Sequence, residues 1–204
     1  MPMHSFTSVR DMTWRHPEWW SIALSVAAWL VLFSNPWHHL SHDTIGASLL
    51  LWLLMIVAMM FPLVIAQVRD TAFRSLWRRR HRAIGCFLTG YLFSWVLFGA
   101  AVLAIRAMWA AAPSTAAVVA VAIAAAWQLS PWKRRALRRC HRVMPLGPIG
   151  WRANVSCARF GWGIGGSCIG ACGALMTACA LMEHSMLAMG VVTALTMRER
   201  AANF

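Results

Sequence analysis

Long runs of apolar residues, separated by short polar connections, are the dominant pattern along this chain. Four of these runs begin near Trp19, Ile45, Ala83 and Ala110, and each approaches the length needed to cross a lipid bilayer. Hydrocarbon offers no water to backbone polar groups, so runs of this kind form helices. The period-2 alternation that is typical of membrane barrels is absent. The pattern therefore predicts an all-α fold, a polytopic integral membrane helix bundle.

A fifth apolar stretch, from Phe160 to Met197, is too long for one span. A polar pair, Glu183-His184, interrupts it, and we expect a turn there. The chain is then predicted to have a tail over residues 1–18 and a single transmembrane domain over residues 19–204. The six expected spans are 19–34, 45–68, 83–105, 110–130, 160–182 and 184–200.

The basic residues give these spans an orientation. The chain has 19 Lys+Arg against 6 Asp+Glu, and every basic residue except Arg106 falls in the connections 69–82 and 130–159 or in the two tails. Loops rich in arginine and lysine stay on the cytoplasmic side, so both termini are expected to be cytoplasmic. The net charge of +13 is then explained by orientation and by contact with membrane lipid, and not by nucleic acid.

The expected fifth span carries a stripe of glycine and cysteine. At about 100° per residue, Cys168, Cys172 and Cys179 share one helix face, and Gly161 and Gly165 lie close to it. Small residues of this kind allow close helix packing. Cys168 and Cys172 are also four residues apart, so both could face one metal ion. The sequence leaves packing and metal binding open.

Methionines form a second candidate group. Met55 and Met59 share a face of the second expected span, with Met60 beside them, and Met176 follows in the fifth. Thioethers are soft ligands that suit Cu(I). Methionine also packs well between helices, so these residues alone do not decide between the two roles.

Histidines and carboxylates collect on the expected outer face. The connection SNPWHHLSHDT and the turn at 183–184 lie on the same side of the predicted membrane. Imidazole and carboxylate ligands together suit Cu(II), Zn(II) or Ni(II). Solvated histidines in an interfacial loop are the alternative. The candidate ligands are His38, His39, His42, Asp43, Glu183 and His184.

The segment after Ser130-Pro131 is basic and amphipathic, and it is expected to lie on the cytoplasmic membrane surface. It ends at Cys140-His141, a further candidate for a metal or thiol site. No nucleophile–base motif, phosphate-binding loop or HExxH motif is present, so the sequence favours binding over catalysis. No carboxylate falls at mid-span, which disfavours ordinary proton-coupled transport.

Three segments resemble an uncharacterised bacterial family of predicted metal-binding integral membrane proteins. They are MIVAMMFP (55–62), WQLSPWKRRALRRCHR (127–142) and GGSCIGACGALM (165–176). This sequence has Ala136 where the family often has a second cysteine. The resemblance spans about residues 45–200 and implies a multi-pass protein of the bacterial inner membrane.

Three function classes follow from these observations. The leading hypothesis is a metal-handling membrane protein that binds or passes copper through Met, Cys and His ligands, with a membrane or periplasmic protein partner. The second is a structural or assembly subunit of a larger membrane complex. The third is a membrane electron-carrier subunit, which would need facing mid-membrane histidines that the sequence does not offer.

Overall fold

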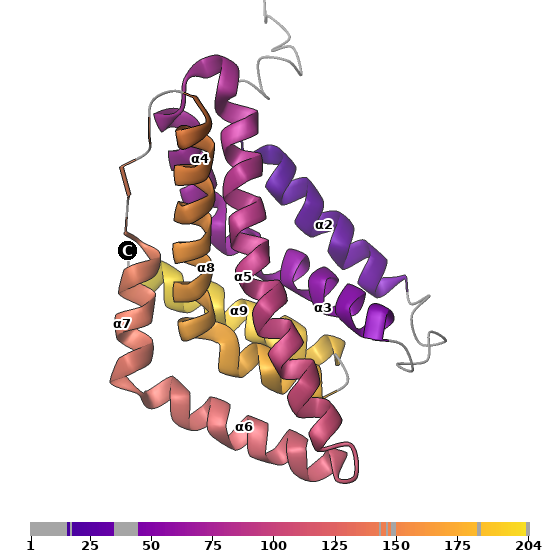
Figure 1. Cartoon of the computed structure of the whole chain (residues 1–204). Coiled ribbons are helices and arrows are strands. Elements are labelled where there is room, and N and C mark those ends of the chain that lie inside the picture. The colour runs from indigo at the N-terminus through magenta and orange to yellow at the C-terminus, as the bar shows by residue number, and fades with distance from the viewer. Residues whose placement is uncertain are drawn as a thin grey trace, which may run out of the picture.

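The computed structural model is helical throughout its described part, which comprises residues 16, 18–34, 45–142, 144–145, 147, 150–182 and 185–202. The all-α prediction is confirmed for this part, in which no strand occurs (Figure 1). The α-helices are α2 (Trp19–Phe33), α3 (Ile45–Met60), α4 (Ile65–Arg74), α5 (Arg80–Met108), α6 (Pro113–Leu129), α7 (Pro131–Cys140), α8 (Gly150–Leu181) and α9 (Met186–Ala202). Two short 3₁₀ helices are η2 (Pro62–Val64) and η3 (Trp77–Arg79).

A bend at Pro62 divides the expected span 45–68, which we had taken as one continuous helix. The helix up to Met60 and the segment from Pro62 onward meet at 47°. Proline has no N–H, so it cannot bond to the carbonyl four residues earlier. That carbonyl, of Ala58, instead accepts a hydrogen bond from Ser25 Oγ of α2 at 2.8 Å. The carbonyl freed at the bend therefore links α2 to α3 by a hydrogen bond, and α4 runs in a different direction from α3.

The helices α5 and α8 form the centre of the structure and run parallel. Gly161 of α8 lies against Phe87 of α5, and further along Gly173 lies against Phe98. The backbones touch, because a Cβ added to Gly161 would come within 1.9 Å of the Phe87 carbonyl oxygen. The glycine part of the predicted stripe thus serves close helix packing.

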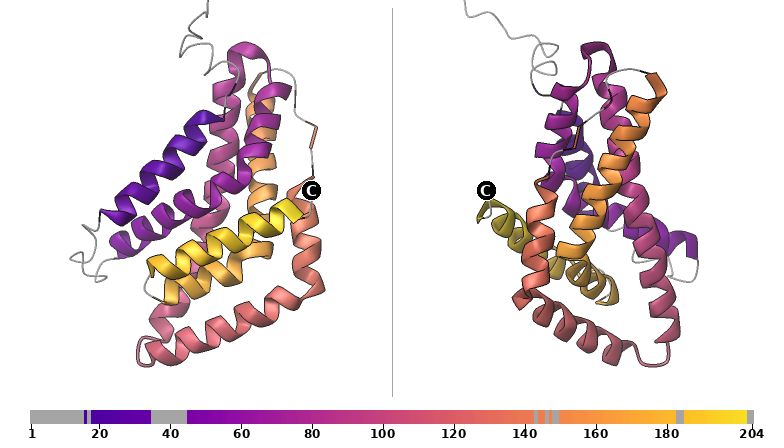
Figure 2. Two further views of the ribbon diagram at one scale, coloured as in Figure 1. Left: turned by 180° about the vertical axis from the view of Figure 1, so that it is seen from behind. Right: turned by 60° about the vertical axis from the view of Figure 1, so that its left-hand side comes forward.

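The helices α6 and α7 form an L-shaped pair around α8, bent by 74° (Figures 1 and 2). The bend falls at Ser130-Pro131, where Ser130 caps α7 by accepting a hydrogen bond from the Trp132 N–H. At the corner, Trp127 Nε1 donates to the Gly170 carbonyl at 2.9 Å. The expected basic segment is thus a helix, but it is not only a surface helix, since Lys133, Leu137 and Cys140 are buried.

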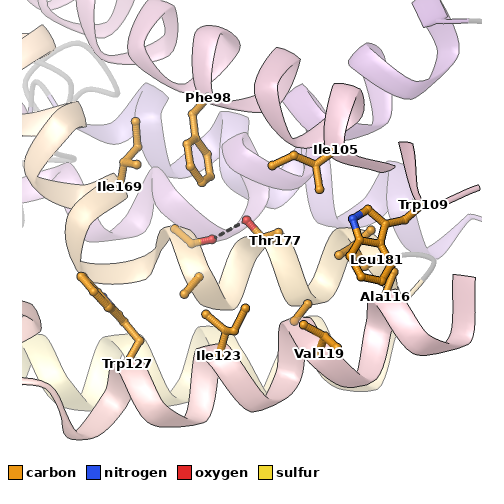
Figure 3. Close-up of a pocket in the computed structure, with 13 residues that line it drawn as sticks. Phe98, Ile105, Trp109, Ala116, Val119, Ile123, Trp127, Ile169, Thr177 and Leu181 are labelled. Atoms are coloured by element: carbon orange, nitrogen blue, oxygen red, sulfur yellow. Dashed lines mark hydrogen bonds between the residues drawn. The ribbon is translucent and has the colours of Figure 1, made fainter. Parts of the chain in front are cut away.

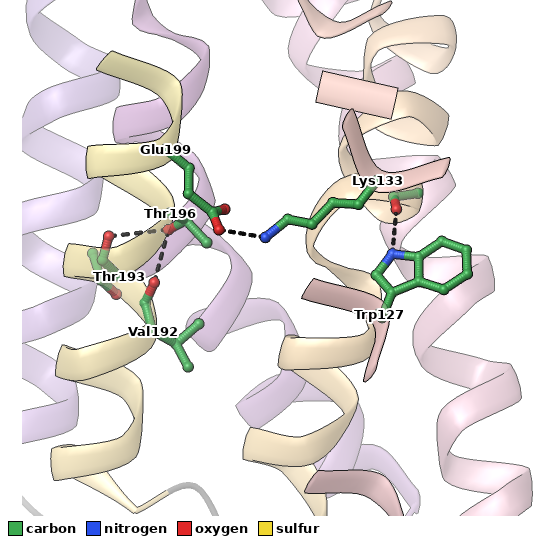
Figure 4. A network of polar contacts seen from close by, with 7 residues as sticks. Trp127, Lys133, Val192, Thr193, Thr196 and Glu199 are labelled. Carbon is green, nitrogen blue, oxygen red and sulfur yellow. Dashed lines mark hydrogen bonds and ion pairs between the residues drawn. The ribbon is translucent and has the colours of Figure 1, made fainter. Parts of the chain in front are cut away.

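The last helix, α9, joins this pair through buried polar groups. Lys133 Nζ of α7 contacts Glu199 Oε1 of α9 at 2.5 Å, and the lysine side chain is 2% exposed (Figure 4). The end of α9 consequently lies beside the end of α7 (Figures 1 and 2). Arg200, which we had counted among the basic residues of the C-terminal tail, and Glu199 both belong to this helix.

Arginine-rich segments meet at one end of the molecule. There Arg79, just before α5, donates to the Gly150 carbonyl at 3.1 Å and to Asn154 Oδ1 at 2.6 Å, at the beginning of α8. Figure 1 shows α4 and the beginnings of α5 and α8 at this end, and the turn between α5 and α6 at the other. The first basic connection therefore lies against the beginning of α8.

Length and composition identify membrane-spanning candidates in the described chain. Two helices, α5 and α8, are long and apolar enough to cross a membrane, and there are up to four if each bent pair counts as one span. The helix α2 is apolar but shorter. The start of α8 at Gly150, ten residues before the expected fifth span, lengthens that helix into the predicted connection.

Candidate functional site

Two cysteines from different helices meet in the core. Cys140 is the last residue of α7, Cys168 lies in the middle of α8, and their Sγ atoms are 3.9 Å apart. Both side chains are fully buried, and neither forms a disulfide. The structure thus brings together two thiols that are 28 residues apart in the sequence.

The spacing of the two sulfurs suits a shared metal ion. Metal–thiolate bonds of about 2.3 Å, the length known for zinc, separate two sulfurs by about 3.8 Å at a tetrahedral angle. A trigonal angle separates them by about 4.0 Å with the same bond length. The observed 3.9 Å lies between these values, so the pair could bind an ion without moving apart.

The position of Cys140 depends on α4. Carbonyl groups in the last turn of a helix have no partner within the helix. The Cys140 carbonyl accepts a hydrogen bond from Gln67 Nε2 of α4 at 2.8 Å. The bend at Pro62 directs α4 toward this contact, so the end of α7 is held against the core.

A buried arginine contacts the same pair. Arg200 of α9 is 6% exposed, and its Nη2 donates to Cys168 Sγ at 2.8 Å. Its Nη1 donates to the carbonyl of Leu63, which follows the bend at Pro62. Tyr91 of α5 is fully buried in the same core cluster, and among the described residues its hydroxyl has no hydrogen-bond partner. The site therefore holds a fixed positive charge beside the sulfur of Cys168.

Further sulfur atoms line the buried face of α8. Cys172, Met176 and Cys179 follow Cys168 on one helix face, at steps of about 5–6 Å along the axis. All three belong to the same core cluster as Cys140 and Cys168. The structure places them in a row that leads away from the thiol pair.

Methionines of two other helices complete this sulfur-rich core. Met55, Met59 and Met60 of α3 and Met189 of α9 are fully buried in the same cluster. Met60 lies three residues before Leu63. The guanidinium of Arg200 donates both to the Leu63 carbonyl and to Cys168 Sγ. The end of α3 therefore approaches the thiol pair, and the predicted methionine face points into the protein.

A cavity of about 460 Å³ opens between α7 and α8 beside the thiol pair. Arg139 and Arg142 line it, and they flank Cys140 in the sequence. From α8, Ile164 and Ser167 line it, and Ser167 is followed directly by Cys168. Met144, 45% exposed, contributes a thioether at the surface. The lining is basic and includes the residues directly before Cys140 and Cys168, while the two cysteines themselves are buried behind it.

His141 follows Cys140 at the end of α7. Burial lowers the pKa of its imidazole, and the positive charge of Arg200 lowers it further. The ring is therefore neutral at pH 7.

A second cavity, of about 440 Å³, has a different character (Figure 3). It lies between α5, α6 and α8, with Phe98, Trp109 and Trp127 in its walls. Its lining contains no sulfur atom and no charged side chain. This cavity cannot supply soft metal ligands and is separate from the thiol site.

The structure unites part of the predicted ligand set. Cys140, Cys168, Cys172 and the four methionines Met55, Met59, Met60 and Met176 share one core. The outer set, comprising His38, His39, His42, Asp43, Glu183 and His184, lies outside the described residues. Within the described residues, no three His, Cys, Asp or Glu side chains form a metal site.

Arg200 is the residue at this site that sequence reasoning missed. It was expected among the solvated charges of the C-terminal tail, and it is instead buried against Cys168. The signal available in the sequence was spacing, since Met189, Thr196 and Arg200 share one helix face. The structure buries all three. Cys140 was a candidate, but nothing in the sequence paired it with Cys168.

The fold and the site define a class of helical protein with a buried, soft, sulfur-rich centre. Comparison with protein families matches residues 49–204 to the family PpoB2, described as copper chaperone. The chain belongs to this copper chaperone family. Comparisons with curated proteins and with solved structures gave no match. The predicted link to copper is confirmed at the level of the family.

Proposed function

We propose that this protein is an integral membrane copper chaperone that binds Cu(I) between Cys140 and Cys168 and passes it on. The thiol pair carries the proposal, because its sulfur spacing of 3.9 Å is that of two thiolates on one ion. Membership of a copper chaperone family supports copper as the cargo. Soft thiolate and thioether ligands select Cu(I) over the harder metals.

Exposed apolar side chains support a membrane location. In α2, Ser21 is fully buried and Ser25 nearly so, whereas Leu30 and Phe33 are 64% and 65% exposed. A helix that faces water has the reverse arrangement. The helices α6 and α9 also expose large apolar residues, including Val118 and Leu187. Lipid would cover these surfaces, which in water would favour aggregation.

Methionines supply the remaining coordination in this proposal. Cu(I) held by two thiolates can accept a thioether as a third ligand. Met60, the last residue of α3, is fully buried in the same core cluster as the thiol pair and is the candidate for this role. The row of Cys172, Met176 and Cys179 on α8 offers successive soft ligands for movement of the ion. Transfer along such a row is ligand exchange and requires no change in oxidation state.

The first test is Cu(I) binding by purified protein in mild detergent. Wild type is expected to bind one Cu(I) at the thiol pair, with sulfur-only coordination in the copper X-ray absorption spectrum. Cys140→Ala and Cys168→Ala should each lower the affinity at least 100-fold, since each removes a thiolate. Competition with a chromogenic Cu(I) chelator measures the affinity.

Cys157→Ala is the matched control, because Cys157 is also buried in α8 but lies outside the sulfur-rich core. It should bind copper as wild type does. Wild-type protein that takes up no Cu(I), or a Cys157→Ala variant as defective as Cys168→Ala, would contradict the proposal.

A further inference from the structure

The cavity next to the thiol pair is positively charged although the proposed cargo is a cation. Arg139 and Arg142 line the cavity between α7 and α8, and both side chains are exposed. Arg200 adds a buried positive charge at Cys168. Among the described residues, no acidic side chain lines this cavity. A bare Cu⁺ ion approaching by this route would be repelled at the mouth and again at the sulfur.

The cargo is negatively charged, and no longer positively charged, when copper arrives already bound to thiolates. A Cu(I) ion held by two thiolates is a unit with one net negative charge, since two S⁻ ligands outweigh one Cu⁺. Clefts lined by one sign of charge attract the opposite sign and accelerate association. Arginines at the mouth of a cavity would therefore concentrate an anionic copper–thiolate complex near the buried cysteines.

We propose that the cavity lined by Arg139 and Arg142 is the loading port of this protein, and that it selects Cu(I) presented as an anionic thiolate complex. This inference rests on the proposed function and adds the route and the chemical form of the cargo. Met144, at the rim of the port, gives the complex its first soft ligand. Cys140 and Cys168 then replace the thiolates of the donor.

Loading is a ligand exchange that balances without a redox partner. Two copper–sulfur bonds form, to Cys140 and Cys168, and two copper–sulfur bonds to the donor break. Copper stays in the +1 state throughout. Each protein thiol that gives up its proton transfers it to a departing donor thiolate, which leaves as a neutral thiol.

Two donors with the same ligand atom but opposite charge test the port. Cu(I)–glutathione is anionic, whereas Cu(I)–cysteamine is cationic because of its ammonium groups. Wild type should take copper from the anionic donor at least 10-fold faster, and added salt should reduce the difference. The rate is measured as copper retained on the protein after timed gel filtration in a neutral detergent.

Arg139→Gln/Arg142→Gln should slow loading from Cu(I)–glutathione about 10-fold and leave the final copper content unchanged. Arg134→Gln/Arg138→Gln is the matched control, because it removes the same charge from exposed positions of α7 that do not line the port. This control should load at nearly the wild-type rate. Met144→Leu should slow both donors alike, since a lost ligand acts independently of charge, and Met108→Leu, at an exposed position outside the port, should slow neither.

The outcomes separate the two proposals. Equal wild-type rates from both donors, or an equal slowing by the control pair, would overturn the loading port while copper binding stands. Wild-type protein that binds no copper from either donor would overturn the proposed function and this inference with it.

Discussion

Arg200 shows how one residue can connect three segments of the chain. Its guanidinium contacts Cys168 of α8 and the Leu63 carbonyl beside the bend at Pro62, while its backbone belongs to α9. Hydrogen bonds from a charged group contribute more than neutral ones, and losing a partner inside a protein leaves a buried polar group unsatisfied. The residue therefore stabilises the helix arrangement and also determines the charge at the thiol pair.

Arg200→Met should lower the free energy of unfolding by roughly 2 kcal/mol or more, because two hydrogen bonds from a charged group are lost. Thermal unfolding in mild detergent measures the effect as a lower midpoint. Arg198→Met is the control, since Arg198 lies on the same helix and is exposed. A midpoint for Arg200→Met equal to that of the control would show that the contact contributes no stability.

At the scale of the element, small residues decide how closely α5 and α8 approach. Gly90 and Gly161 lie where the two backbones touch, and a Cβ at Gly90 would come within 2.0 Å of the Ala158 carbonyl oxygen. This contact places the Cys168 face of α8 against α5. The same face of α8 therefore packs against α5 and carries the Cys168 thiol.

Gly161→Ala should destabilise the protein by about 1–3 kcal/mol, the usual cost of overpacking a tight contact. Gly166→Ala, five residues further along the same helix, meets nothing within 4 Å. It should be neutral or stabilise by up to about 1 kcal/mol, because alanine favours helix over glycine. Denaturation of both variants side by side gives the comparison, and a neutral Gly161→Ala would show that the backbones do not touch.

At the scale of the whole molecule, the arginine-rich end coincides with the end at which α5 and α8 both begin. The helices α5 and α8 run parallel, and both begin at the end where Arg79 contacts Gly150 and Asn154. The connection between α5 and α6, with Arg106 near it, lies at the opposite end (Figure 1). If lipid surrounds this bundle, the positive-inside rule places the arginine-rich end in the cytoplasm.

A topology reporter inserted in the connection between α5 and α6 should read periplasmic, and one inserted between α7 and α8 should read cytoplasmic. A reporter after the C-terminal residue should also read cytoplasmic, as expected for an even number of spans. Paired alkaline phosphatase and fluorescent protein fusions at each position make the measurement. A periplasmic signal at the C-terminus would exclude the six-span topology.

The sequence predicted the helical fold because the apolar runs leave no other way to satisfy backbone groups in hydrocarbon. It also predicted soft ligands on α3 and α8, because residues four apart share a helix face whatever surrounds the helix. The bend at Ser130-Pro131 followed from the same local rules, since proline disfavours helix in the residue before it. The bend at Pro62 was not predicted, because proline is tolerated near helix ends. Only the structure shows that the carbonyl left free by Pro62 accepts a hydrogen bond from Ser25.

Only the tertiary structure decided which soft residues meet. Cys140 and Cys168 lie on helices joined by a long connection, so their separation depends on the 74° bend, on the Gln67 contact and on the close approach of α5 and α8. Arg200 and Lys133 looked like surface charges because no local pattern distinguishes a solvated arginine or lysine from one with a buried partner. Helix formation is local and can be read from the chain, whereas the assembly of this site depends on contacts between segments far apart in the sequence.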